Sequence, residues 1–268
     1  MQIAIICSTK DQASMNIREQ LLPYFKETDK KFDNHKIYEK QNKENHLTLY
    51  TTDIESVYYE NIDKKIQADL FIFATKHVSK SGIHSLSVHF PGNWGKAELG
   101  GKDKTLCIAP SSILKTAFLE LNKLKTDYEI IQECTHHGPY INKPAIFIEI
   151  GSDKKQWQDK KAGKNIAKVI LKITEKNPKY KAVIAFGGLH HSPNFKKILL
   201  NTEFAVSHVC PKYNLENLNK NNIEQAIEKT VEKVEFIVLD WKGLGQEKNR
   251  IIKILEELNI KYKKSKEF

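Results

Sequence analysis

The feature that most constrains the fold of this chain is a regular alternation of short apolar runs with apolar stripes at helical spacing. Several of the runs are apolar on both faces, which is typical of buried, largely parallel strands. The runs are Gln2–Cys7, Leu47–Thr51, Leu70–Thr75, Thr105–Ala109, Glu129–Glu133, Ala145–Ile150, Ala182–Phe186, Phe204–Val209 and Phe236–Leu239. The helical stripes are Ser112–Leu124, Ile166–Ile173, Ile223–Val234 and Ile251–Leu258. This alternation predicts an α/β fold with a mixed, mainly parallel sheet flanked by helices.

The length of the chain and its polar segments bound its domain organisation. With 268 residues, the chain suits one α/β domain over residues 1–268, in which the part from about residue 212 can form a small C-terminal subdomain. The polar, lysine-rich stretch 26–45 predicts a surface excursion, and 261–268 predicts a charged tail. The stretch 212–222 is the best candidate for a hinge or an insertion.

The charge balance suits a polyanionic partner. The chain has 43 Lys+Arg against 33 Asp+Glu, a formal net charge of +10, which favours a partner such as RNA. Only two of the basic residues are arginines, Arg18 and Arg250, so the excess of lysine can instead reflect genome composition or adaptation to heat. Charge alone therefore does not identify the partner.

The start of the chain and the cysteines indicate the compartment. The chain begins directly with a strand and lacks the basic region and apolar core of a signal peptide. No apolar stretch reaches the roughly 18 residues that a membrane-spanning helix needs. The four cysteines are widely spaced, without a CxxC pair, so we expect buried reduced thiols and no disulfide framework. Together these observations predict a cytoplasmic protein.

Reactive side chains gather where the predicted strands end. In parallel α/β sheets, ligands bind beyond the carboxyl ends of the strands. Six strand ends carry such residues: Lys76 and His77; Glu133, His136 and His137; Glu149; His190 and His191; His208; and Asp240. A single histidine beside an apolar run is more often structural than functional, but six equivalent positions favour an active site on this edge.

Strand geometry separates the members of each histidine doublet. Successive side chains of a strand point to opposite faces of the sheet. If the chain stays extended, Glu133 and His137 share one face and His136 lies on the other. We therefore expect only one of the two neighbouring histidines to contact a given ligand, unless a helix or a tight turn intervenes. The same expectation holds for His190–His191.

A second polar cluster lies in Gly82–Gly95. Its glycine, proline and asparagine residues indicate a loop, which contains His84, His89 and Asn93. Loops on a rigid scaffold are where substrate contacts concentrate. The alternative, equally well supported by these residues, is a surface loop whose Trp94 packs on the core.

Several common site motifs are absent from the sequence. It contains no GxGxxG after the first strand and no GxxxxGK[ST], so a glycine-rich loop for nucleotide phosphates is unsupported. It also contains neither a GxSxG nucleophile elbow nor an HExxH zinc helix. These absences favour a water activated by histidine or by a metal over a serine nucleophile.

A set of short motifs extends over nearly the whole chain. They are DQASMNI (Asp11–Ile17), ATKHVSKSGIHSLSVHFPGNWG (Ala74–Gly95), APSSILKTAFLEL (Ala109–Leu121), ECTHHGP (Glu133–Pro139), FIEIGSDKKQW (Phe147–Trp157), FGGLHHSPNF (Phe186–Phe195) and SHVCPKY (Ser207–Tyr213). The THHGP and EIGS pieces, in this order, are specific. With these motifs the chain resembles the archaeal- and plant-type D-aminoacyl-tRNA deacylases.

The resemblance implies both a reaction and a cofactor. The reaction is hydrolysis of the ester between a D-amino acid and the terminal ribose of tRNA. The family is zinc-dependent, with two ions per subunit, and its chain is a monomer. Its fold is similar to those of peptidyl-tRNA hydrolases and nucleoside phosphorylases, in agreement with the α/β pattern. The sequence supplies enough histidine and carboxylate groups to bind zinc.

Two positions depart from the family pattern. His191 stands where the family has an aromatic residue after the histidine of its GGxH motif, which puts a role for His191 in doubt. Lys76 stands where the family often has arginine, so a bidentate fork is replaced by a point charge that can still bind phosphate.

The candidate residues divide into three roles. Ester hydrolysis needs an activated water, a stabiliser for the oxyanion and a place for the end of the tRNA. The catalytic candidates are His137, His190, His208 and Glu133; the metal-binding candidates are His136, His137, His190 and Glu149. The substrate-binding candidates are Lys76, His77, His84, His89, Asn93 and Lys212. Backbone amides around Gly138, Gly187 and Gly188 are candidate oxyanion donors.

Two other functions remain open at this point. A zinc peptidase or amidohydrolase of similar fold would use the same sheet edge and would not need a basic face. A non-catalytic tRNA- or RNA-binding protein would explain the charge but not the reactive residues at the strand ends. An assay with D- and L-aminoacyl-tRNA, with and without a chelator, separates the three.

Overall fold

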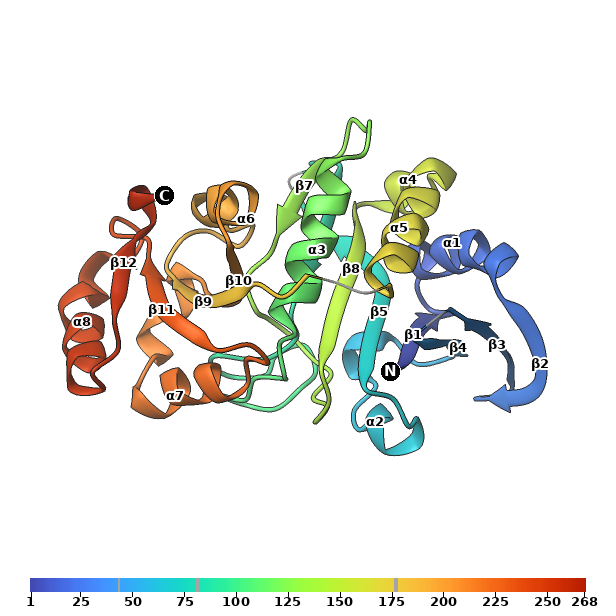
Figure 1. Cartoon of the computed structure of the whole chain (residues 1–268), viewed down its shortest axis with the longest axis horizontal. Coiled ribbons are helices and arrows are strands. Elements are labelled where there is room, and N and C mark those ends of the chain that lie inside the picture. The colour runs from blue at the N-terminus through green and yellow to red at the C-terminus, as the bar shows by residue number, and fades with distance from the viewer. Residues whose placement is uncertain (43, 81, 176–177) are drawn as a thin grey trace.

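The computed structural model describes residues 1–42, 44–80, 82–175 and 178–268. Within them, the strands form an eight-stranded and a four-stranded sheet (Figure 1). The first sheet has the order β2 (Lys26–Phe32), β3 (His35–Gln41), β4 (His46–Thr52), β1 (Gln2–Ser8), β5 (Leu70–Val78), β8 (Ala145–Ser152), β6 (Ser85–His89) and β7 (Glu129–Gln132). The second has the order β10 (Phe204–Cys210), β9 (Lys181–Phe186), β11 (Val234–Leu239) and β12 (Tyr262–Lys264).

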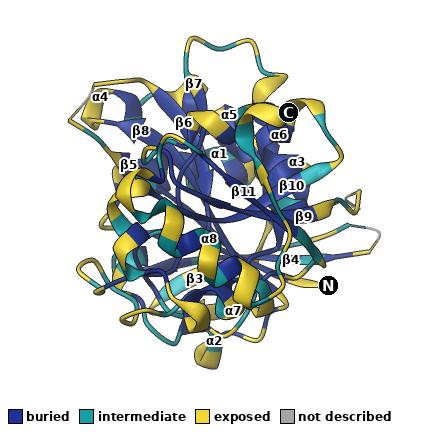
Figure 2. Cartoon of the chain, turned by 90° about the vertical axis from the view of Figure 1, so that its left-hand side faces the viewer, coloured by how far each residue is buried: buried dark blue, intermediate teal, exposed yellow. Residues whose placement is uncertain are grey.

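The helices cover both sheets. They are α1 (Gln12–Leu21), α2 (Ile62–Lys65), α3 (Ser111–Asn122), α4 (Lys154–Trp157), α5 (Lys160–Ile173), α6 (Lys196–Asn201), α7 (Lys220–Glu228) and α8 (Lys248–Glu257). In Figure 2, α7 and α8 cover one side of the molecule, exposing their outer faces in front of buried strands. The predicted fold class, a mixed and mainly parallel sheet flanked by helices, is confirmed.

The first sheet is not parallel throughout, because two of its strands, β6 and β7, run in the opposite direction to β8. Strands β4, β1, β5 and β8 pair in parallel, whereas β6 pairs antiparallel with β8 and parallel with β7. Strand β7 therefore runs against β5 and β8. The expectation that all the reactive residues follow strands at one carboxyl edge is wrong for the residues after β7.

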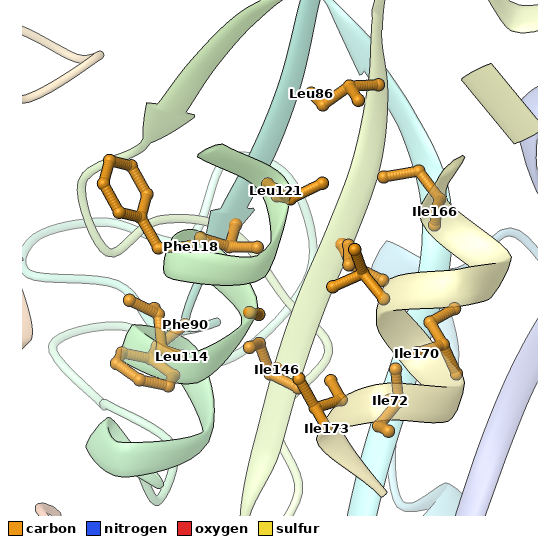
Figure 3. Packing of buried hydrophobic residues seen from close by; sticks show 14 of the residues in the cluster. Ile72, Leu86, Phe90, Leu114, Phe118, Leu121, Ile146, Ile166, Ile170 and Ile173 are labelled. Carbon is orange, nitrogen blue, oxygen red and sulfur yellow. The ribbon is translucent and has the colours of Figure 1, made fainter. Parts of the chain in front are cut away.

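The two sheets share one hydrophobic core. Strand β1 alternates, so that Ile3 and Ile5 join the larger core while Ala4 and Ile6 face the other side of the sheet. The larger core also includes residues of α3 and α5 and, from the second sheet, Val183 and Val206. Figure 3 shows side chains of α3 and α5 packed against β5, β6 and β8. Helix α3 therefore packs against both sheets in this core.

Several predicted segments have a different structure. Thr105–Ala109 is no strand: it forms only isolated bridges, and Ile108 pairs with Pro144, which has no N–H to extend a ladder. Residues 26–45 contain the antiparallel strands β2 and β3, and Gly82–Gly95 contains β6. The tail from residue 261 adds β12 to the second sheet. The third helical stripe ends early, because α7 stops at Glu228.

The second sheet begins at Lys181, before residue 212, where the sequence places a small subdomain. Lys212–Asn217, in the predicted hinge, forms a 3₁₀ helix. All four cysteines are free and buried, as expected. Among the described residues, no helix has the length and apolar character to cross a membrane.

Candidate active site

One face of the first sheet changes from apolar to polar where β5, β8 and β6 lie side by side. On this face, Phe71 and Phe73 of β5 are followed by Thr75 and His77. The strand register places Thr75 beside Glu149 of β8, which in turn pairs with Ser87 of β6; the next row joins Phe73, Phe147 and His89. All of these side chains are buried. Two-residue periodicity therefore brings His77, His89 and Glu149 onto one surface.

Gly151 of the EIGS motif makes room for this arrangement. Its residue pairs with His77 on one side and Ser85 on the other. A Cβ atom at Gly151 would lie 2.9 Å from His77 Cδ2 and 2.5 Å from Ser85 Oγ, closer than such atoms can approach. Glycine is therefore required sterically beside the His77 ring.

The segment after β7 brings the first histidine doublet to the same surface. The strand ends at Gln132, and His137 has a left-handed backbone with φ of 48°. As a result the His136 and His137 rings lie 4.3 Å apart, and the His89 ring lies 4.4 Å and 4.9 Å from them, respectively. The expectation that only one member of the doublet would reach a given site is wrong, because the segment is not extended.

The second sheet contributes His190 through the turn after β9. Gly187 and Gly188 have φ values of 93° and 82°, which favour glycine. His190 Nε2 lies 2.9 Å from Glu133 Oε2, and its Nδ1 lies 3.0 Å from the Tyr213 hydroxyl. The Cys134 thiol contacts both His190 Nδ1 (3.4 Å) and the Tyr213 hydroxyl (3.3 Å).

Three of the histidines present the same nitrogen to the centre of the group. The Nδ1 atoms of His89, His136 and His137 lie 3.2, 2.9 and 2.7 Å from the backbone carbonyl oxygens of Phe90, Cys134 and Gly138. A ring that donates from Nδ1 to a carbonyl has its lone pair on Nε2. This tautomer and second contact are those of metal-binding histidines in general.

Two buried carboxylates lie among the rings. Glu133 Oε2 is 3.1 Å from His77 Nδ1 and 3.7 Å from His136 Nε2. Glu149 Oε2 is 3.7 Å from His77 Nδ1 and 3.6 Å from His89 Nε2, while its Oε1 accepts a hydrogen bond from Thr75 at 2.7 Å. Within the described part of the chain, Glu133 Oε1 and the Nε2 atoms of His77 and His89 are buried without a hydrogen-bond partner.

Burial and mutual repulsion keep one part of the histidine group neutral. Burial, together with the neighbouring rings, lowers the pKa of His136 well below its usual range and that of His137 to about 3. Neutral imidazole is the form that binds a metal.

The two histidines that contact Glu133, His190 and His77, have raised pKa values. Burial alone would lower the pKa of His190, but hydrogen bonds with Cys134 and Glu133 outweigh it and raise that pKa to about 10. The pKa of His77 is also raised, because its contact with Glu133 outweighs burial. Burial would raise the pKa of Glu133, yet the hydrogen bonds from His190 and His77 hold it well below its usual range. A bound cation would supply the same positive charge.

The described residues contain four sets of three that could hold a metal ion, each with its ligand atoms within 4.8 Å of one another. They are His89–His136–His137, His77–Glu133–His190, Cys134–His136–His190 and His89–Glu133–Glu149, and the first two have no residue in common. Ligands of one tetrahedral zinc at about 2.0–2.2 Å are about 3.3–3.6 Å apart. The contacts of Glu133 with His77 and His190, at 3.1 and 2.9 Å, are close to this spacing. The donor set of nitrogen, oxygen and a nearby thiol is one that zinc accepts.

A pocket with a volume of about 450 Å³ opens over this group. His77, His136, His137, His190 and Glu149 form part of its lining. On another side it is lined by Asp11, Glu55 and Lys76. Lys76 Nζ lies 2.5 Å from Glu55 Oε1, and the backbone N–H of Lys76 donates to Asp11 Oδ2 at 2.8 Å. Burial raises the pKa of Asp11 to about 6.

Four predicted site residues lie elsewhere. His208 is fully buried against Phe90 and Trp94, with its Nδ1 3.3 Å from Thr135 Oγ1, and burial lowers its pKa to about 3. His84 is exposed beside Tyr128, and Lys212 is exposed at the start of its 3₁₀ helix. The Asn93 amide donates to the carbonyl oxygens of Gly100 and Lys102, which places it in the support of a loop.

Two of the predicted oxyanion donors are already engaged. The N–H groups of Gly138 and Gly187 donate to the carbonyl oxygens of Leu99 and Cys210, at 2.9 and 2.8 Å. They therefore cannot stabilise an oxyanion without breaking these bonds.

Several residues that the structure brings to the group or its pocket are not among those predicted from the sequence. They include Asp11, Glu55, Thr75, Cys134 and Tyr213. Thr75 carries a signal that could have found it, because it lies two residues before His77 and shares its face of the strand. Tyr213 carries none, since it reaches His190 from another segment.

Comparisons with known proteins point in one direction. The sequence profile of the family described as D-aminoacyl-tRNA deacylase matches residues 64–263. A D-aminoacyl-tRNA deacylase of Thermococcus onnurineus is 41% identical over 272 residues, covering 96% of this chain and 98% of its own. One of Methanosarcina mazei is 35% identical over 281 residues, covering 99% and 93%. The crystal structure of a conserved protein of unknown function superposes with a TM-score of 0.88 at 30% identity, covering 99% and 96%.

Proposed function

The chain belongs to the D-aminoacyl-tRNA deacylase family, and on this premise we propose that its histidine–glutamate pocket hydrolyses the ester between a D-amino acid and the terminal ribose of tRNA. The observation that carries the proposal is the group of five histidines and two buried glutamates, of which four histidines and Glu149 line a pocket of about 450 Å³. The products are the free D-amino acid and tRNA.

Zinc is the cofactor that we propose, at two ions per subunit. His89, His136 and His137 would hold one ion, and His77, Glu133 and His190 the other. Two observations support these assignments. Carbonyl contacts at Nδ1 of His89, His136 and His137 leave the lone pair of each ring on Nε2. Hydrogen bonds from His190 and His77 hold the pKa of Glu133 well below its usual range. When bound, zinc lowers the pKa of a water and polarises the ester carbonyl.

Glu149 is the residue that we assign to proton transfer. Thr75 holds its Oε1, so its Oε2 faces both His77 and His89, between the two sets. As water adds to the ester carbonyl carbon, Glu149 accepts its proton. The bond from that carbon to the ribose oxygen then breaks, and the same proton passes to the ribose oxygen. The other proton of the water stays on the product carboxyl group and passes to solvent when that group ionises, so each turnover releases one proton.

The other side of the pocket suits the amino-acid part of the substrate. Asp11 and Glu55 supply negative charge near the place where an α-ammonium group would lie, and Val57 and Leu99 supply apolar surface. Such a fixed amino-group contact is one way in which a pocket distinguishes D- from L-amino acids. We also propose that the enzyme acts as a monomer in the cytoplasm, where aminoacyl-tRNA is used. Light scattering, which measures the molar mass in solution, tests whether it is a monomer.

The test compares D-Tyr-tRNA with L-Tyr-tRNA, with and without a chelator. We expect the D-ester to be hydrolysed and the L-ester largely spared, and the chelator to remove the activity until zinc is restored. Metal analysis should find two ions in the wild type and a reduced content in His89→Ala and in His136→Ala. Equal turnover of both enantiomers would indicate a general esterase. Full activity after verified removal of metal would refute the zinc assignment.

A further inference from the structure

The pocket over the histidine group continues into a second one. This neighbour has a volume of about 550 Å³ and shares His77, Val78 and His190 with the first. Its other lining residues include Lys80, Ile83 and Leu189. Val78, Ile83 and Leu189 are 65%, 40% and 53% exposed, so the second pocket offers apolar surface to solvent beside the histidine group.

The second pocket leads to a third. The third has a volume of about 410 Å³ and shares Pro193 with the second. It lies between the start of α6, the turn after β11 and the C-terminal segment, and Figures 1 and 2 both show α6 beside the C-terminal end. Through these shared lining residues the three pockets are successive neighbours from the first sheet to the second, and we refer to them together as the groove.

The third pocket combines lysines with an aromatic side chain. Lys197, Lys242 and Lys266 line it and are exposed. None of these three forms an ion pair within the described residues. Trp241 also lines it and is partly buried, and the ammonium groups of Lys264 and Lys248 lie over its ring, 4.2 and 4.9 Å from the ring centre. Lysines beside an aromatic platform are the combination with which proteins bind single-stranded nucleic acid.

The third pocket has a positively charged lining. It holds the three lysines and one carboxylate, Asp240, which accepts a hydrogen bond from Asn194. The first pocket is lined by three carboxylates, those of Asp11, Glu55 and Glu149, by Lys76 and by four histidines, of which His77 and His190 have raised pKa values. A polyanion is therefore favoured at the third pocket.

We propose that this groove is the path of the single-stranded 3′ end of tRNA. The inference rests on the proposed function, because an ester on the terminal ribose must lie at the histidine group while the preceding nucleotides leave it. The terminal nucleoside occupies the second pocket, against Ile83 and Leu189. The nucleotides before it reach the third pocket, where a base stacks on Trp241 and phosphates contact Lys197, Lys242 and Lys266.

The first experiment measures binding without catalysis. Fluorescence anisotropy follows a labelled single-stranded RNA ending in CCA, over a range of KCl concentrations. The triple variant Lys197→Ala, Lys242→Ala, Lys266→Ala should bind about tenfold or more weakly, and the slope of log affinity against log salt should fall by about 2, as expected for three lost phosphate contacts.

The matched control removes the same charge elsewhere. Lys161, Lys164 and Lys168 are exposed on α5 and form no ion pair in the described residues. The triple variant of these to alanine should bind the RNA within about twofold of wild type, because general attraction by net charge is all that it loses. Equal losses in the two triple variants would overturn the proposal, as would an equal affinity of the wild type for a duplex RNA without a single-stranded end.

The second experiment tests stacking on Trp241. The CCA-ended RNA should quench the tryptophan fluorescence of the wild type, and Trp241→Leu should abolish that quenching and weaken binding at least about fivefold. Trp241→Phe, which keeps an aromatic ring, should restore most of the affinity. Quenching that survives in Trp241→Leu would refute the stacking assignment, even if the variant is less stable.

Kinetics separate the groove from the proposed function. With D-aminoacyl-tRNA, the lysine triple variant of the third pocket should show a KM raised about tenfold and kcat within about twofold of wild type. If the wild type hydrolyses D-aminoacyl-tRNA and the KM does not change, the groove is wrong and the function stands. If the wild type does not hydrolyse the ester at all, the function is wrong, and the binding data alone decide on the groove.

Discussion

His208 and His136 are both buried histidines whose pKa values burial depresses, yet they have different surroundings. His136 lies among three other histidine rings and a carboxylate. His208 lies against Phe90 and Trp94, and its Nδ1 is 3.3 Å from Thr135 Oγ1. A depressed pKa therefore reports burial in both cases and does not distinguish a site residue from a core residue.

We predict that His208→Ala lowers the stability and leaves the chemistry intact. Removing a buried ring leaves a cavity, which should cost roughly 2–4 kcal/mol in the free energy of unfolding. Turnover per folded molecule and metal content should match the wild type. Thermal or denaturant unfolding, together with active-site-normalised rates, measures both quantities.

The comparison variant is His136→Ala, which should lose metal and roughly 10²-fold or more in rate. A loss of rate in His208→Ala as large as that in His136→Ala, at equal folded fraction, would return His208 to the active site.

The sequence predicted several residues of the candidate site but not which of them lie together. His77, His137, His190 and Glu133 were identified because they stand at strand ends. The positive φ of His137, which lets His136 join the same group, follows from packing of the loop and has no signature in the sequence. The side chains of two neighbouring histidines point to opposite faces only where the backbone is extended.

At the scale of secondary-structure elements, β6 shows what a loop-like composition can conceal. Its residues alternate as Ser85, Leu86, Ser87, Val88 and His89, a two-residue period between glycines and a proline. Leu86 and Val88 join the larger core, while His89 faces the histidine group. The flanking glycine and proline favoured a loop, and the strand was missed because five residues are short for a periodicity argument.

Helix α3 shows a second tertiary effect on local structure. The helix begins at Ser111, and Pro110 stands at the N-cap position, where no side chain of the segment caps the helix. Instead, the Glu232 carboxylate, from the segment before β11, accepts hydrogen bonds from the backbone N–H groups of Ser111 and Ser112, at 2.9 and 2.8 Å. A carboxylate at this end also complements the helix dipole.

We therefore expect Glu232→Ala to destabilise the protein by about 1–2 kcal/mol, because two backbone N–H groups lose their acceptor. Equilibrium denaturation measures the change. Glu224, exposed on α7, supplies the control, since Glu224→Ala should stay within about 0.5 kcal/mol of wild type. Equal effects of the two substitutions would mean that α3 does not depend on this contact.

At the scale of the whole molecule, Lys115 joins the two sheets. It projects from α3, is almost completely buried, and its ammonium group donates to the carbonyl oxygens of Thr202 and Phe204, at 2.5 and 2.9 Å. Burial lowers its pKa from 10.5 to about 8. The unfolded chain therefore holds the Lys115 proton over a range of pH in which the folded chain has released it.

This difference predicts how stability depends on pH. Because the folded pKa is the lower one, raising the pH from about 8 to 10.5 favours the folded state, and the contribution is lost as the pH falls through 8. The stability of the wild type relative to Lys115→Met should therefore rise over this range. Lys168→Met, a substitution at an exposed position of α5, should show no such rise. A wild type and Lys115→Met that follow parallel curves would contradict the assignment.

The histidine group takes His190 from the turn after β9, and this has a consequence for the order of events during synthesis on the ribosome. β9 is an inner strand, flanked by β10 and by β11, which ends at Leu239. Neither neighbour has been translated when His190 leaves the peptidyl-transferase centre. The ribosome must therefore have passed Leu239 before both neighbours of β9 are available to fix the position of this imidazole. A nascent chain that is still attached near residue 200 carries His77, His89, His136 and His137 but lacks β11, so the histidine group is completed only after this strand has been made.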